Sequence, residues 1–167
     1  MRVYVPATLP SLTACVNTAA LQPAPLAAYA VTPALREWYV EGDLEELEYA
    51  AMTAAARSAL RLLRDDPAAP RRRVVIAADA RESDVVFTGN LDHEPSAVRV
   101  GTPIAFDAIV SAHVDDPAAE DDVAAAVEAL PAADGGDEDA AFAVDGAEGH
   151  ELAWYAVQEL PDMIRQA

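Results

Sequence analysis

The chain has no lysine and few basic side chains of any kind. Its 11 basic residues, all arginines, stand against 29 aspartates and glutamates, and the formal net charge is -18 at pH 7. Proteins that hold nucleic acid through its phosphates need a surplus of lysine and arginine, and so do proteins that adhere to anionic membranes. We therefore expect neither nucleic acid nor a membrane surface as a partner.

Long uninterrupted apolar runs are also missing. Residues 3–35 carry no charged side chain, but a membrane-spanning helix needs about 20 consecutive, predominantly apolar residues. Prolines divide this stretch into pieces that are too short: Pro6, Pro10, Pro23, Pro25 and Pro33. We therefore expect a cytoplasmic protein in which this stretch supplies short strands and helices.

The single cysteine, Cys15, cannot form an internal disulfide or build a zinc site made of cysteines. Residues 12–15 read LTAC, which matches the cleavage box of bacterial lipoproteins. A lipoprotein signal needs a basic start and an unbroken apolar segment before that box. Here Arg2 stands alone and two prolines interrupt the segment. We favour a small buried helix cysteine over a lipid-modified one.

The negative charge is concentrated in the second part of the chain. Residues 1–99 hold 13 acids and 10 arginines, whereas residues 100–167 hold 16 acids and one arginine. A cluster of arginines precedes residue 74: Arg57, Arg61, Arg64, Arg71, Arg72 and Arg73. Guanidinium groups suit phosphate and carboxylate alike, so this cluster is a candidate anion-binding site. The competing hypothesis, which the net charge favours, is that these arginines pair with the chain's own acids.

The strongest secondary-structure signal is a helix from Asp43 to about Arg64. Asp43 followed by Glu46 resembles a capping box. Glutamates crowd the first half of this segment and arginines its last turns, which matches the helix macrodipole. Small and apolar residues recur at three- and four-residue steps and predict the buried face: Leu44, Leu47, Ala51, Ala54, Ser58 and Leu62.

Apolar and β-branched runs predict the strands, at residues 2–5, 27–31, 73–79, 85–87, 97–100, 104–114 and 152–157. Further helices are expected after Thr8, Thr32, Pro117 and Pro161. This pattern predicts an α+β fold in a single domain of residues 1–167, with a mixed or antiparallel sheet packed by helices.

Two finer features of the fold are also predicted. A strand–helix–strand pattern ends in the residues Tyr-Ala-Val at both 29–31 and 155–157, which suggests two β-α-β units of a ferredoxin-like sheet. Residues 132–149 are rich in glycine, alanine and acids, and we expect them to form a mobile acidic loop.

His113 offers the main candidate for metal or catalytic chemistry. If His113 and Asp115 lie on a strand, their side chains project to the same face. Together with Asp116 they could ligate a divalent metal or supply a general base. In a chain with 29 acids, however, a histidine beside an aspartate also arises without any purpose, and one of these aspartates then simply caps the following helix.

Several segments resemble an uncharacterised actinobacterial protein family, a domain of unknown function. They read RVYVPAT at 2–8, AYAVTPAL at 28–35, EELEYAA at 45–51, HVDD at 113–116 and WY at 154–155. The resemblance covers most of the chain and implies a bacterial cytoplasmic protein. It carries over no catalytic residue.

The chain contains no glycine-rich phosphate loop, nucleophile elbow or two-cysteine metal motif, so no cofactor is predicted. The larger aromatic residues are expected in the core or at its edge: Tyr4, Trp38, Tyr39, Tyr49, Trp154 and Tyr155. We hypothesise a small acidic interaction or regulatory protein without catalytic activity, with a protein partner or as a homodimer built on a sheet edge or on these aromatics.

Two alternative functions stay open at this point. One is a metal-binding or hydrolytic domain that uses His113, Asp115 and Asp116. The other is an acidic mimic of DNA, which the charge of the second half favours. Such a mimic needs its acids held at the spacing of phosphates, and the glycines around Gly135 argue against that order.

Overall fold

The computed structural model describes all 167 residues and contains a seven-stranded sheet. Its strands are β1 (Arg2–Ala7), β3 (Leu26–Tyr29), β4 (Val74–Asp79), β5 (Val85–Phe87), β6 (Ala97–Val100), β8 (Ile109–Asp115) and β9 (Leu152–Ala156). Their order across the sheet is β5-β6-β3-β1-β4-β8-β9, and all neighbours are antiparallel. The predicted α+β fold with an antiparallel sheet is therefore confirmed.

Helices and one small ribbon surround this sheet. The helices are α1 (Leu9–Thr18), α2 (Pro33–Trp38), α3 (Leu44–Asp65), α4 (Glu120–Asp134), α5 (Glu138–Glu148) and α6 (Leu160–Gln166). A two-stranded ribbon joins β2 (Ala20–Leu21) to β7 (Ile104–Ala105). None of the helices combines the length and the apolar character that crossing a membrane requires.

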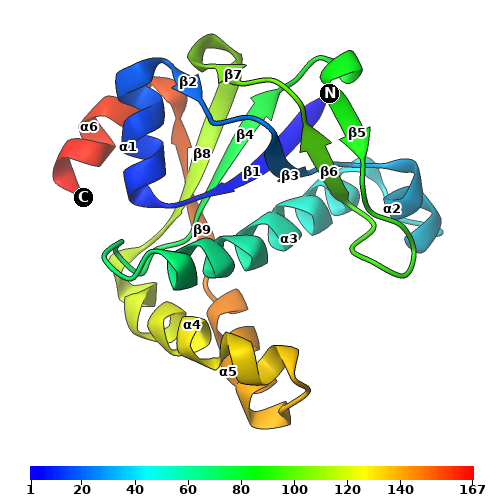
Figure 1. Cartoon of the computed structure of the whole chain (residues 1–167), viewed down its shortest axis with the longest axis vertical. Helices are drawn as coiled ribbons and strands as arrows, with labels where there is room; N and C mark the ends of the chain where they lie inside the picture. Colours follow the sequence, from blue (N-terminus) through cyan, green and yellow to red (C-terminus); the bar gives the residue numbers. More distant parts are fainter.

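The sheet separates two cores because side chains alternate along each strand. On one face, α1 and α6 pack on Val3, Val5 and Ile76, and Cys15 is buried among them. On the other face, α2 and α3 cover Tyr4 and Val75. Each fully buried valine, leucine or isoleucine stabilises the fold by about 1.5–3 kcal/mol. Figure 1 shows α1 and α3 on opposite sides of the sheet.

A third core joins the C-terminal half of α3 to the α4–α5 hairpin. Leu60 and Leu63 of α3 pack against Val123, Leu130 and Val144. Alanines fill the remaining positions of this core and let the three helices approach closely. In Figure 1 the hairpin projects beyond the sheet on the side of α3.

The ferredoxin-like arrangement with two β-α-β units is not confirmed. Both expected units connect antiparallel neighbours, β1 with β3 and β8 with β9, whereas a β-α-β unit connects parallel strands. A crossover between parallel strands does occur elsewhere. It runs from β3 through α2 and α3 to β4, and these two strands flank β1.

Helix α3 confirms the capping signal predicted for it. The Asp43 side chain accepts a hydrogen bond from the Glu46 N–H, and the Glu46 carboxylate accepts one from the Asp43 N–H. The buried face differs in part from the predicted one. Leu47 and Ala51 are buried as predicted, but Leu44 and Leu62 are exposed, and burial continues through Ala55, Ala59 and Leu63. Each four-residue step turns the helix by about 40°, so the buried face winds around α3, from the sheet in its first half to the hairpin in its second half.

The loop expected over residues 132–149 is contradicted by the structure. Helix α4 continues to Asp134, and α5 occupies most of the remaining segment. Asp137 caps α5 by accepting a hydrogen bond from the Ala140 N–H at 2.8 Å. Alanine has the highest helix propensity, and Val144 and Ala147 bury the inner face of the helix. Tertiary packing therefore outweighs the glycine and acid content of this segment.

Candidate functional site

The junction between α2 and α3 places aromatic side chains at the surface. Thr32 caps α2, and its hydroxyl donates to the carbonyl oxygen of Pro95 at 2.5 Å. The chain then turns tightly after the helix, where a Cβ on Gly42 would lie 3.0 Å from that of Tyr39. The turn and the tether together hold the end of α2 and the loop that carries Glu94 beside the first turns of α3.

A groove of about 900 Å³ runs between these elements. Its aromatic residues are Trp38, Tyr39 and Tyr49, and Trp38 and Tyr49 are 59% and 60% exposed. The four acids that line it are Glu45, Glu46, Glu94 and Glu148, and its single basic residue is Arg57. The groove therefore combines exposed aromatic rings with a surplus of negative charge.

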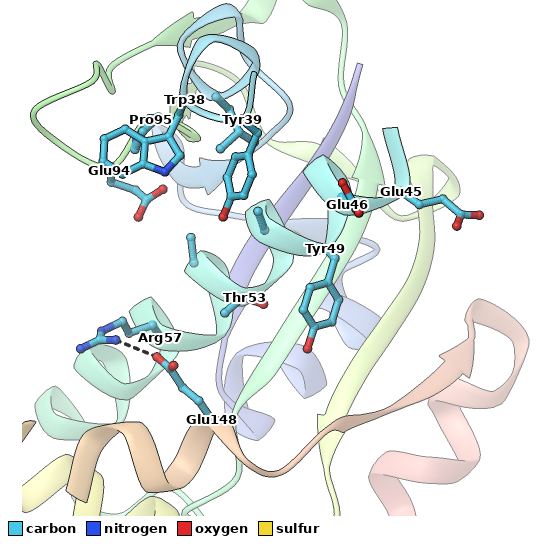
Figure 2. A pocket seen from close by; sticks show the side chains of 13 residues that line it. Trp38, Tyr39, Glu45, Glu46, Tyr49, Thr53, Arg57, Glu94, Pro95 and Glu148 are labelled. Carbon is cyan, nitrogen blue, oxygen red and sulfur yellow. Dashed lines mark hydrogen bonds and ion pairs between the residues drawn. The ribbon is translucent and has the colours of Figure 1, made fainter. Parts of the chain in front are cut away.

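Figure 2 shows how these side chains are arranged along the groove. Trp38 and Tyr39 lie at one end, where Glu94 also lines the groove. Tyr49 and Thr53 project from α3 farther along, and the Arg57–Glu148 pair marks the opposite end. Small residues of α3, Ala50 and Ala54, contribute to the lining and leave space between the two ends.

The charges of the groove are not balanced by the chain itself. Arg57 lies 2.8 Å from Glu148 and 3.5 Å from Asp145, so its positive charge already has partners. Glu94 accepts hydrogen bonds from Ser96, the shorter one at 2.6 Å. No arginine pairs with Glu45, Glu46 or Glu94. Three glutamates beside exposed aromatic rings thus remain without a cationic partner.

Only two of the six aromatic residues expected in the core or at its edge are substantially buried. Tyr4 is buried and Tyr155 is half-buried, but Trp38, Tyr39, Tyr49 and Trp154 are exposed. One signal for this was present in the sequence, because Tyr49 lies outside the predicted apolar face of its helix. Trp38 and Tyr39 stand at a helix end directly before a glycine turn, where no periodicity indicates which way they point.

The first arginines of the cluster bind acids of the α4–α5 hairpin. Arg61 donates two hydrogen bonds to Asp134, at 2.8 and 3.1 Å. This hydrogen bonding raises the pKa of the Arg61 guanidinium and holds the pKa of the Asp134 carboxyl below its usual value. Arg57 binds the hairpin through Glu148 and Asp145, and Arg64 contacts only its neighbour Asp65.

The last three arginines of the cluster bind the chain between α3 and β8. Arg73 is fully buried and forms an ion pair with the buried Asp115 at 2.8 Å, and it also donates to the carbonyl oxygens of Ala147 and His150. Arg72 donates to the Asp115 carbonyl, and Arg71 donates to carbonyls near the end of α3. All six arginines therefore have partners within the chain, and an added anion would have to compete with these.

The three residues predicted to hold a metal do not form one ligand group. Both carboxylate oxygens of Asp115 accept hydrogen bonds from Arg73. Asp116 accepts a hydrogen bond from the Ala118 N–H and so caps the short turn that follows. His113 lies 3.4 Å from the Ser111 hydroxyl. No group of three or more histidine, cysteine or acidic side chains is placed to hold a metal ion.

His113 instead lines a second, smaller hollow of about 360 Å³ on the sheet face beside α3. Tyr4, Glu48, Ser111 and Trp154 also line it. Burial lowers the pKa of the His113 imidazole and raises the pKa of the Tyr4 phenol. Tyr49 borders both this hollow and the groove, so the two are neighbours on one surface.

The sequence matches the protein family described as "Family of unknown function (DUF6912)" over residues 1–164. The chain therefore belongs to this family, and the predicted resemblance to a domain of unknown function is confirmed. No curated protein and no solved structure matches the chain. The interpretation of the groove accordingly depends on its own residues.

Proposed function

We propose that this protein is a non-catalytic interaction protein whose groove between α2 and α3 binds a basic segment of a partner protein. The observation that carries the proposal is the combination of exposed aromatic rings with glutamates that no arginine neutralises. An exposed apolar patch with a polar rim marks an interaction surface. Tyrosine and tryptophan are the side chains that such surfaces favour.

Arginine or lysine side chains of the partner fit this lining for two physical reasons. A cation over the face of tryptophan or tyrosine gains about 0.5–1 kcal/mol at an exposed site. Glu94 and Trp38 line the same groove and are drawn at the same end of it (Figure 2), so a cation bound there is attracted by both the ring and the carboxylate. Glu45 and Glu46 supply further negative charge at the start of α3.

An extended peptide fits the groove better than a compact small molecule does. Sites for small molecules usually bury most of the ligand's surface. Here the aromatic side chains that would contact the ligand are largely exposed, so the groove is open to solvent. The spread of the lining from Trp38 to Arg57 (Figure 2) suits several successive side chains of one chain segment.

A fluorescence titration tests the proposal. Changing Trp154→Phe leaves Trp38 as the only tryptophan, and its emission then reports on the groove. A peptide that alternates arginine and alanine should shift this emission in a saturable manner, and an otherwise identical peptide with glutamate should not. Changing both Glu45→Gln and Glu94→Gln should weaken binding about tenfold, because two exposed charge contacts are lost.

The matched control changes Glu120→Gln and Glu128→Gln, two exposed acids of α4 outside the groove. This control variant has the same net charge as the groove variant. If both variants weaken binding equally, the peptide responds only to the overall negative charge and the proposed groove is wrong. If the arginine peptide leaves Trp38 emission unchanged, the proposal fails outright.

A further inference from the structure

Strand β9 is an edge of the seven-stranded sheet, and most of it lacks the features that usually protect an edge. Its residues, LAWYA, include no charge and no proline. It pairs with β8 over five consecutive positions without a bulge, and no strand lies beyond it. Exposed edges of this kind offer unpaired N–H and C=O groups to another strand, and natural proteins normally block them.

The opposite edge of the sheet is better protected. Strand β5 has three residues, Val85–Phe87, and a short 3-10 helix leads directly into it. A very short edge strand offers few positions for pairing. The contrast makes β9 the edge that is open to a further strand.

The backbone groups of β9 that face outward can be identified from one hydrogen bond. The Ala156 N–H donates to the Glu159 carboxylate at 2.7 Å and so points away from β8. Because N–H directions alternate along a strand, Leu152 and Trp154 also direct their backbone groups outward. Ala156 is thus capped, and Leu152 and Trp154 form the open part of the edge.

The side chains of this open part are apolar and lie on one face of the sheet. Leu152 packs at the border of the core beneath α3, and Trp154 lines the hollow on the same face. Trp154 is 61% exposed although it stands within a regular strand. A large exposed apolar side chain beside an unpaired strand edge indicates a surface to which another strand can bind.

We propose that β9 pairs antiparallel with β9 of a second copy of this chain, around a two-fold axis at Ala153. In this register Leu152 of one copy lies opposite Trp154 of the other, and each pair exchanges both backbone hydrogen bonds. The two Trp154 side chains then cover the two Leu152 side chains.

The lack of charge on β9 favours a second copy of this chain, and not a basic peptide, as the partner that pairs with this edge. The strand itself is uncharged, so two copies can meet here although each carries a net charge of -18. The proposed register also places Glu151 opposite Tyr155, so that the flanking glutamates of the two copies do not face each other. A basic segment would find no acidic side chain within this strand. The proposal is independent of the peptide groove.

Sedimentation equilibrium over a wide range of protein concentration tests the pairing. The mass should rise from that of one chain, 17.6 kDa, to twice this value. Changing Trp154→Lys should weaken the association by about 30-fold or more, the loss expected for a central aromatic anchor. The control Phe142→Lys introduces the same charge at a site of α5 that is 80% exposed, and should leave association unchanged.

Amide hydrogen exchange of the unaltered chain gives a second readout that does not depend on the folding of a variant. The Leu152 and Trp154 amides should exchange more slowly as protein concentration rises, and the amides of β5 should not. A mass that stays at one chain at every concentration overturns the proposal. So does equal weakening by both lysine variants, or exchange at β9 that is independent of concentration.

Discussion

The two ends of α3 carry opposite charges, and the chain uses them differently. At the C-terminal end, Arg57 and Arg61 pair with acids of the α4–α5 hairpin. At the N-terminal end, Glu45 and Glu46 line a groove beside exposed aromatic rings and have no arginine partner. The paired end joins parts of one molecule, and the unpaired end is available to another.

The same comparison changes the meaning of the net charge. The sequence presents an arginine cluster and an acidic second half as two separate poles. In the structure the two regions meet, because acids of α4 and α5 bind Arg57 and Arg61 in the second half of α3. The acidic side chains that have no basic partner are therefore a better guide to binding than the net charge of the whole chain.

The largest effect is expected from breaking the most buried pair of the arginine cluster. Changing Asp115→Ala leaves the Arg73 guanidinium buried without its carboxylate. Removing one partner of a buried ion pair costs about 3–5 kcal/mol, and urea unfolding followed by circular dichroism measures this loss. Asp116→Ala is the control, because it removes only a cap and should cost about 1 kcal/mol. Equal losses for the two variants would show that the buried pair does not anchor the fold.

A smaller, pH-dependent effect is expected at the exposed pair of the same region. Hydrogen bonding from Arg61 holds the pKa of Asp134 below its ordinary value of 3.8. The pair therefore stabilises the fold above that pH, and this contribution is lost as the pH falls through the lowered pKa. Arg61→Ala should reduce the urea midpoint slightly at pH 7, and added salt should shrink the difference. A difference that persists unchanged at low pH and high salt would contradict this account.

The smallest effect is expected at His113, in the hollow beside the unpaired end of α3. Burial lowers the pKa of this imidazole below 6.5, so the unfolded chain binds its proton more readily than the folded chain does. Stability should consequently fall as the pH drops below about 6.5, and level off below the folded pKa. His113→Asn should remove this part of the pH dependence between pH 7.5 and pH 5, as measured by thermal unfolding. An unchanged pH profile would show that His113 is not the group responsible.

Local signals in the sequence predicted the elements that depend on neighbouring residues. The capping box at Asp43 and Glu46 and the cap at Thr32 are both formed by groups within a few residues of each other. Strand β4 was also predicted from a local signal, because its continuous apolar run is typical of a strand that is buried on both faces. Helix α5 was not predicted. Its buried residues, Ala140, Val144 and Ala147, do follow helical spacing, but two of the three are alanines, and the glycines and acids of this segment are typical of a loop.

The candidate site could not be predicted in the same way. Its lining comes from α2, α3, the loop at Glu94 and the end of α5. These segments lie far apart in the sequence. The hydrogen bond from Thr32 to Pro95 spans 63 residues, and the pair of Arg57 with Glu148 spans 91 residues. The one visible hint was Tyr49, which lies outside the predicted apolar face of α3.

The sequence by itself thus determined the fold class, most of the elements, the cap of α3 and the absence of a surplus of basic charge. Periodicity, capping and composition act over a few residues or over the whole chain, and both kinds of information can be read without a structure. The tertiary structure alone decided which acids the arginines meet and which aromatics stay exposed. With 29 acids available to 11 arginines, the packing of α3 against the sheet and the hairpin selects the partners and leaves Glu45, Glu46 and Glu94 without an arginine.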